Sequence, residues 1–195
     1  YIIDSLCYWA SEYHIDGFRF DLMGVLDIET LNEARKALLK INPDIIMYGE
    51  GWTGGESTLP ESERGMKINA PRTPGIGMFS DDIRDAVKGH VFYMDELGFV
   101  NGAADRGEEL KQAVTCAKWA KSPMQSINYL SCHDNYTLWD RFIISNSHES
   151  EEMRIRMNKL AAAILFTAQG IPFFLHGEEF ARTKISEADG APVEN

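Results

Sequence analysis

The stretch Ile15-Asp-Gly-Phe-Arg-Phe-Asp-Leu-Met-Gly24 is a short apolar strand pattern that ends in a carboxylate, Asp21. Two further strand-like runs end in the same way, Ile45-Ile-Met-Tyr-Gly-Glu-Gly-Trp52 and Ile127-Asn-Tyr-Leu-Ser-Cys-His-Asp-Asn135. In chains that alternate strands and helices, such residues come to the C-terminal rim of a parallel sheet or barrel, where α/β enzymes build their sites. The pattern therefore indicates carboxylate chemistry on a neutral, hydroxyl-rich substrate.

Strand and helix patterns alternate along the chain, which predicts an α/β fold made of repeated strand–helix units. In the first strand, period-two alternation puts Arg19 and Asp21 on one face and two phenylalanines on the other. The expected helices lie at 1–13, 28–41, from about 81, at 107–120 and at about 150–169, and the expected strands at 15–21, 44–49, 76–80, 125–132 and 173–176.

The number of strand–helix units indicates how much of a barrel the chain can form. A complete eight-stranded barrel takes about 250 residues, or roughly 31 per unit. Four to five units in 195 residues predict about half of such a barrel. An open, doubly wound sheet is the structural alternative, but no GxxxxGK[ST] phosphate loop follows any expected strand. The segment Gly51–Met78 is rich in Gly, Pro, Ser and charge, which predicts a long functional loop at the rim.

Composition narrows the class of partner. The net charge of −11 and the pI near 4.9 argue against nucleic acid or an anionic membrane surface, because no basic stripe could neutralise phosphates. No apolar run approaches the ~18 residues of a membrane span. The three cysteines form no ligand pattern and are expected to be buried thiols, while His90 and His148 are expected at the surface, so no metal or cofactor is expected. The localisation, cytoplasmic or secreted, stays open.

Asp21 and Glu50 fit the two carboxylate roles of glycoside hydrolysis, in which one acid protonates the leaving oxygen and a second carboxylate attacks or activates water. Arg19 would lower the pKa of Asp21 and keep it ionised, as a nucleophile requires. Glu50 lies between Tyr48 and Trp52, in surroundings apolar enough to raise its pKa and hold a proton near neutrality. A purely structural Arg19–Asp21 salt bridge is an equally supported alternative.

Other polar and aromatic residues near strand ends are weaker candidates. His133 and Asp134 could reach sugar hydroxyls, although a buried histidine satisfied by a backbone carbonyl is the commoner outcome. Trp52 could bind substrate by stacking on a pyranose face, or could pack at the rim. Glu178-Glu179 follows the last apolar run and could reach the site, although a position in the first turn of a helix is more common.

Five segments, taken in order, resemble a known family. They are Asp16–Gly24, Tyr48–Trp52, Phe79–Gly89, Ser131–Asn135 and Gly170–Phe180. They are similar to the segments at barrel strands four to eight of the α-amylase superfamily, glycoside hydrolase family 13, and within it to the type I pullulanases. The resemblance implies a partial (β/α)8 TIM barrel containing strands 4 to 8 with their helices. It also implies that residues 1–195 are the C-terminal half of a catalytic domain from a longer enzyme.

The resemblance implies roles for individual residues. Asp21 matches the nucleophile, Glu50 the general acid/base, and Asp134 the third carboxylate, which stabilises the oxocarbenium-like transition state. Arg19 and His133 match positions that hold the nucleophile and the substrate hydroxyls. The variants Phe-Asp-Leu-Met-Gly and Gly-Glu-Gly-Trp favour hydrolysis of α-1,6 linkages in pullulan or branched α-glucans over α-1,4 cleavage. The resemblance also implies a retaining mechanism. Isoamylase-like, glycogen-debranching and α-1,4-acting relatives are the near alternatives.

The sequence also departs from the family pattern. It lacks the Asp-x-x-x-Asn-His segment of the third strand, the first two strands, the N-terminal motif of type I pullulanases and the C-terminal β-domain. A half-barrel would expose two edge strands and an apolar face, so the chain alone is expected to self-associate and to have little hydrolytic activity. A non-catalytic, carbohydrate-binding half-barrel is the second interpretation.

Overall fold

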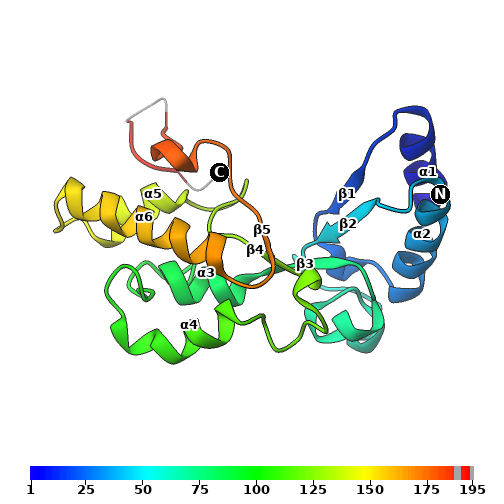
Figure 1. Ribbon diagram of the computed structural model, residues 1–195, viewed down its shortest axis with the longest axis horizontal. Helices are drawn as coiled ribbons and strands as arrows, with labels where there is room; N and C mark the ends of the chain where they lie inside the picture. The colour runs from blue at the N-terminus through cyan, green and yellow to red at the C-terminus, as the bar shows by residue number, and fades with distance from the viewer. Residues whose placement is uncertain (187–189, 194–195) are drawn as a thin grey trace. The chain divides into compact units, whose positions relative to one another are not determined.

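The computed structural model describes residues 1–186 and 190–193 of the chain, and in it strands alternate with helices (Figure 1). The strands are β1 (Gly17–Phe20), β2 (Ile46–Gly49), β3 (Gly77–Ser80), β4 (Ser126–Asn128) and β5 (Ile171–Pro172). The helices are α1 (Ile2–Glu12), α2 (Ile28–Ile41), α3 (Asp81–Lys88), α4 (Gly107–Val114), α5 (Leu138–Ser145) and α6 (Glu151–Thr167). The strands form one sheet in the order β1-β2-β3-β4-β5, and β2 pairs in parallel with β1 and with β3. The expected α/β fold is confirmed.

The chain divides into two compact units. Unit 1 comprises Tyr1–Phe79 and Lys118–Ile127, and unit 2 comprises Ser80–Ala117 and Asn128–Asn195. Each unit has its own apolar cluster, so each is described by itself.

Unit 1 packs α1 and α2 against β1 and β2. Leu31, Ala34 and Leu38 recur at helical spacing along α2 and lie in the apolar cluster of this unit. Phe18 and Phe20 pack against the same cluster, as the alternation in β1 predicts. The guanidinium of Arg19, by contrast, lies 5.5 Å from the ring centre of Phe79 in β3. Within unit 1, one face of β1 therefore packs on the apolar cluster, while the other carries the guanidinium of Arg19.

Asp27 begins α2 as its N-cap residue. Its carboxylate accepts hydrogen bonds from the backbone N–H of Thr30 at 2.6 Å and from the Thr30 hydroxyl at 2.7 Å. These bonds satisfy donors that the first helical turn leaves without an intrahelical partner. The helix ends at Ile41, two residues before Pro43, which cannot continue it.

The segment Lys118–Ile127 belongs to unit 1 although it follows two helices of unit 2. Gln125, which is 3% exposed, attaches this segment to the rest of the unit. Its Nε2 donates to the carbonyl oxygens of Ala70 at 3.0 Å and Thr73 at 3.1 Å. The segment leads directly into β4.

Unit 2 surrounds an apolar cluster with α3, α4, α5 and α6. Ile83, Leu130, Leu138 and Phe142 are all fully buried members of that cluster. Arg84 is buried as well, and its Nη1 donates to the hydroxyl of Tyr129 at 2.6 Å. The interior of unit 2 therefore combines apolar packing with a buried guanidinium that is hydrogen-bonded to a tyrosine hydroxyl.

Some elements differ from those expected. Helix α4 ends at Val114 and not at residue 120, because the Thr115 hydroxyl bonds back to the helix and Cys116 adopts a left-handed φ of 87°. The run 173–176 is not a strand, since β5 contains Ile171–Pro172 alone. The cysteines are half-buried and not fully buried. Among the described helices, none combines the length and apolarity that crossing a bilayer requires.

Helix α5 was absent from the expected elements. Thr137 caps it: its hydroxyl oxygen accepts from the backbone N–H of Asp140 at 3.1 Å and donates to the Asp140 carboxylate at 2.8 Å. Thr137 and Asp140 have the spacing of a capping box, and here the Asp140 carboxylate accepts from the Thr137 hydroxyl. The Thr-x-x-Asp spacing that marks the start of α5 was thus present in the sequence, three residues after Asp134.

Candidate active site

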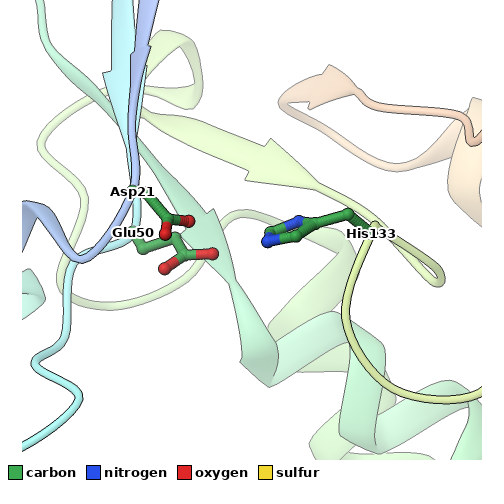
Figure 2. A group of neighbouring side chains, drawn as sticks. All are labelled: Asp21, Glu50 and His133. Atoms are coloured by element: carbon green, nitrogen blue, oxygen red, sulfur yellow. The ribbon is translucent and has the colours of Figure 1, made fainter. Parts of the chain in front are cut away.

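Asp21 and Glu50 occupy corresponding positions at neighbouring strand ends in unit 1. Phe20 pairs with Gly49 in the register of β1 and β2, and each carboxylate follows directly after one of these residues. The side chains point to the same region from the two strand ends, with a carboxylate oxygen of Asp21 within 4.8 Å of one of Glu50 (Figure 2). The sequence-based expectation that the two carboxylates meet at one rim therefore agrees with the geometry of unit 1.

Arg19 interacts with both carboxylates. Its Nη1 lies 3.1 Å from Oδ1 of Asp21, and its Nη2 donates to Oε1 of Glu50 at 2.5 Å. Two carboxylates this close repel each other, and a guanidinium shared between them offsets that repulsion. The same two carboxylates could bind a cation, but Arg19 already supplies the positive charge.

Glu50 lies in more polar surroundings than the sequence suggests. Its side chain is 7% exposed, yet Oε1 accepts from Arg19 and Oε2 accepts from the backbone N–H of Leu22 at 2.9 Å. The side chain of Asp21 is 61% exposed. One carboxylate is therefore buried and held by donors, while the other is accessible to a ligand.

The chain turns sharply after Asp21 to bring the Leu22 amide to Glu50. Leu22 has a φ of 45° and a ψ of 47°, a left-handed conformation that non-glycine residues rarely adopt. Such backbone strain is concentrated at functional sites. This conformation of Leu22 directs its backbone N–H to the Glu50 carboxylate.

Trp52 contributes its backbone to the same region. The Gly24 N–H donates to the carbonyl oxygens of Trp52 at 3.1 Å and Glu50 at 3.3 Å. A Cβ atom at Gly24 would lie 2.5 Å from the Trp52 carbonyl oxygen, so the close approach of these two segments requires glycine. The Trp52 side chain itself is half-buried, which leaves part of the indole accessible for stacking.

His133 and Asp134 lie in unit 2, on the loop between β4 and α5, where Figure 2 labels His133. Their side chains are 49% and 58% exposed, and Nε2 of His133 is 3.4 Å from Oδ1 of Asp134. The expected alternative of a buried histidine is therefore wrong. Both side chains present polar atoms to solvent, as residues that bind sugar hydroxyls must.

Lys184, which the sequence analysis did not single out, anchors this loop. Its Nζ donates to the carbonyl oxygens of His133 and Asn135, the latter at 2.7 Å, and its backbone N–H donates to the Asp140 carboxylate at 2.8 Å. Burial lowers the pKa of Lys184, and the charge of Asp134 opposes that shift. No local pattern marks Lys184, because its partners are far away in the sequence.

Glu178 and Glu179 have different environments. Glu178 is 3% exposed in unit 2 and begins a short helical turn, Glu178–Phe180. Burial raises the pKa of Glu178 to about 7, a shift that the Ser131 hydroxyl and Lys88 oppose. Burial also lowers the pKa of Lys88 to about 7. Glu178 thus belongs to the interior of unit 2, in the first-turn position expected of it, and not to an exposed rim.

Comparisons with known proteins extend these observations. No protein-family model matches the chain. A pullulanase of Bacillus subtilis (strain 168) is 40% identical over 191 residues, which cover 94% of this chain and 26% of that protein. The pullulanase of Anoxybacillus sp. LM18-11, solved with maltotetraose, is 47% identical with a TM-score of 0.93, covering 100% of this chain and 28% of that one. The pullulanase of Paenibacillus barengoltzii, solved with maltohexaose and alpha-cyclodextrin, is 48% identical with a TM-score of 0.91, covering 100% of this chain and 30% of that one.

These likenesses confirm the pullulanase resemblance that the five sequence segments indicated. The fold matches part of a pullulanase over the whole of this chain. The chain spans about a quarter of the length of the Bacillus subtilis relative, 26%.

Proposed function

We propose that this pullulanase-like chain supplies the catalytic carboxylates of a glycoside hydrolase that cleaves α-1,6-glucosidic linkages in pullulan or branched α-glucans. The observation that carries the proposal is the pair Asp21 and Glu50 at adjacent strand ends, bridged by Arg19. The names of the relatives support the substrate class. Because the chain spans 26% of the Bacillus subtilis relative, residues 1–195 are proposed to act within a longer enzyme, as the C-terminal half of its catalytic barrel.

The separation of the two carboxylates supports a retaining mechanism. Retaining glycosidases hold their carboxyl groups about 5–5.5 Å apart, whereas inverting enzymes leave about 6.5–9.5 Å for a water molecule. Oxygens of Asp21 and Glu50 within 4.8 Å favour the first arrangement. Asp21, the more exposed of the two, is the proposed nucleophile.

The proposed reaction has two steps. In the first, Asp21 attacks the anomeric carbon while Glu50 protonates the departing glycosidic oxygen, so that a covalent glycosyl-enzyme replaces the glycosidic bond. In the second, Glu50 takes a proton from water, and the resulting hydroxide displaces Asp21 from the sugar. The proton that Glu50 gives in the first step returns to it in the second.

Arg19 and Leu22 position the reacting groups in this proposal. The guanidinium orients the attacking carboxylate, and the Leu22 amide holds Glu50 from its other oxygen. Asp134 is proposed to stabilise positive charge at the anomeric carbon, and His133 is proposed to bind substrate hydroxyls. The roles of these two rest on the family resemblance and on their exposure.

Self-association of the isolated chain, with little activity, is the second part of the proposal. Large apolar side chains are exposed on and beside α1 in unit 1, among them Tyr8, Trp9 and Tyr13. Patches of this kind favour association. Light scattering that shows a stable monomer, together with release of reducing sugar from pullulan by residues 1–195 alone, would contradict both statements.

The central test compares substrates and products in the longer enzyme. Hydrolysis of pullulan to linear maltooligosaccharides is expected, with the new reducing ends appearing first as the α-anomer in a proton NMR time course. Appearance of the β-anomer first would refute the retaining mechanism. Products that keep their α-1,6 linkages would favour the α-1,4-acting alternative, and binding without any hydrolysis would favour the non-catalytic half-barrel.

A further inference from the structure

Glu178 is a buried carboxylate of unit 2 that the proposed reaction does not use. It is 3% exposed, and neither of its carboxylate oxygens accepts a hydrogen bond of standard geometry within the part of the chain that the structure describes. Burying a carboxylate without donors is costly, so native structures rarely retain such a group without a reason. The two oxygens of Glu178 therefore call for an explanation.

The turn that carries Glu178 is attached to unit 2 through its backbone. The N–H of Glu178 donates to the Leu175 carbonyl at 2.9 Å, and Nδ2 of Asn158 in α6 donates to the Glu178 carbonyl at 3.4 Å. At the start of the same turn, the Glu179 carboxylate accepts from the Gly177 N–H at 2.9 Å. The fold of unit 2 thus determines where the Glu178 carboxylate lies.

The segments that follow β4 and β5 begin side by side. The two strands are neighbours in the sheet, and where they end the N–H of Phe173 donates to the Asn128 carbonyl at 2.7 Å. Ser131 lies in the first of these segments and Glu178 in the second, and both are buried. Burial raises the pKa of Glu178, the Ser131 hydroxyl opposes that shift, and the adjacent charge of Glu179 adds to it. The hydroxyl and the carboxylate therefore interact.

Ser131 closes the loop that carries His133 and Asp134. Its Oγ accepts from the N–H of Leu138, the first residue of α5, at 2.8 Å. Because the oxygen is the acceptor in that bond, the hydroxyl proton is available for donation. A hydrogen bond to an ionised carboxylate is roughly twice as strong as one between neutral groups. Glu178 is a carboxylate in the right place to accept it.

Lys88 brings a positive charge to the same interior. It is 2% exposed in the last turn of α3, and its charge lowers the pKa of Glu178, which burial raises. Burial lowers the pKa of Lys88 itself to about 7. The charges of Arg84 and Arg141 lower it further, whereas those of Glu178 and Asp85 raise it. The ionised form of Glu178 therefore has a cationic neighbour within unit 2.

We infer that Glu178 is a positioning residue that acts through Ser131. Its ionised carboxylate accepts a hydrogen bond from the Ser131 hydroxyl and so orients the oxygen of that hydroxyl toward the Leu138 N–H. The loop between Ser131 and Leu138, which carries His133 and Asp134, is thereby closed at its two ends. The roles of those two side chains in substrate binding rest on the proposed function, whereas the closure of the loop is a property of unit 2 alone.

Hydrogen exchange at the Leu138 amide tests the inference without any substrate. In the longer enzyme, Glu178→Gln keeps the shape and one acceptor oxygen but removes the charge, and is expected to lower the protection of that amide about fivefold at pH 8. Glu179→Gln is the matched control, because this exposed side chain can still accept from Gly177 as an amide. Equal protection in the parent and in Glu178→Gln, or an equal loss in the control, would overturn the inference.

The pH dependence of that protection distinguishes an effect of charge from a loss of packing. Burial raises the pKa of Glu178 to about 7, so its carboxylate is mostly ionised at pH 8 and mostly protonated at pH 6. After correction for intrinsic exchange, the Leu138 amide is expected to be more protected at the higher pH in the parent, and Glu178→Gln is expected to remove this difference. A difference that persists in Glu178→Gln would overturn the inference.

Lys88→Met provides a second variant, which also decides the inference if Glu178→Gln fails to fold. Removing the ammonium charge disfavours the ionised carboxylate of Glu178, so the midpoint of the change in Leu138 protection is expected to move to higher pH. A midpoint that stays in place or moves to lower pH would contradict ionised Glu178 as the acceptor and overturn the inference.

Activity on pullulan tests whether the effect reaches the substrate. Glu178→Gln and Ser131→Ala are each expected to raise KM about fivefold at pH 8, with kcat within about twofold of the parent. The double variant is expected to be no worse than Ser131→Ala alone, because both changes affect the same hydrogen bond. Additive increases in KM would show that Glu178 does not act through Ser131, which overturns the inference. If the parent does not hydrolyse pullulan, the proposed function fails, while exchange at Leu138 still decides the positioning role.

Discussion

The two units hold their candidate residues in different ways. In unit 1 the candidate side chains are themselves bound, because Arg19 and the Leu22 amide donate directly to the carboxylates. In unit 2 the backbone is bound instead, since Lys184 donates to the carbonyls of the loop while the side chains of His133 and Asp134 stay exposed. Groups that perform proton transfer and attack need fixed geometry, and groups that receive a ligand need accessibility.

Removing the carboxylates of unit 1 is expected to have the largest effect. In the longer enzyme, Glu50→Gln is expected to lower the rate of pullulan hydrolysis by ~10²–10⁴-fold, because the amide cannot deliver a proton. Asp21→Asn is expected to be at least as damaging, since no glycosyl-enzyme forms. Reducing-sugar release measures both, with Glu29→Gln, an exposed residue of α2, as the control. Rates within a few-fold of the parent would refute the assigned roles.

Arg19→Lys tests whether one guanidinium must serve both carboxylates. Lysine keeps the charge but lacks the fork that reaches two partners, so kcat is expected to fall about 10²-fold while KM changes little. Arg156→Lys is a suitable control, because Arg156 forms an exposed pair with Glu152 at 2.8 Å. A kcat equal to that of the control would mean that charge alone suffices.

Lys184→Met tests how the anchored backbone of unit 2 contributes to substrate binding. Losing the bonds to the loop carbonyls is expected to raise KM about tenfold through loss of a preformed loop, with a smaller effect on kcat. Hydrogen exchange should become faster for amides in the segment 131–138 and stay unchanged in α2. Faster exchange with an unaltered KM would contradict the prediction, because it would show that substrate binding does not depend on the order of this loop.

The smallest expected effect concerns the stability of unit 1. Asp27→Ala removes the cap of α2 and is expected to cost about 1 kcal/mol in the free energy of unfolding at pH 7. The Thr30 amide lowers the pKa of Asp27 below its ordinary value of 3.8. The stabilisation is therefore present above pH 3.8 and is lost as the pH falls through the lower pKa of the folded state.

Asp27→Asn provides the matched control for that pH dependence, because asparagine is also a good N-cap residue and does not titrate. Chemical denaturation at several pH values measures the difference between the three proteins. A difference between the parent and Asp27→Ala that stays constant below pH 3.8 would contradict the assignment.

Local patterns predicted the positions of the carboxylates but not the contacts around them. Period-two alternation correctly placed Arg19 and Asp21 on one face, because alternation is a property of any strand. The polar surroundings of Glu50 depend on the left-handed turn at Leu22, for which the residue type gives no signal. The anchoring by Lys184 comes from a residue 49 positions beyond Asn135, and contacts of that range arise only from the folded chain.

The attachment of Lys118–Ile127 to unit 1 has a consequence for biosynthesis. Because the strand order equals the sequence order, each strand can dock on its predecessor as the chain emerges from the ribosome. The hydrogen bonds that Gln125 donates within unit 1 nevertheless cannot form until Gln125 has been synthesised, 52 residues after its partner Thr73. At ~5–20 residues per second this interval lasts about 3–10 s, during which the carbonyls of Ala70 and Thr73 must rely on solvent. Translation speed across α3 and α4 thus sets how long the growing chain carries an incomplete first unit.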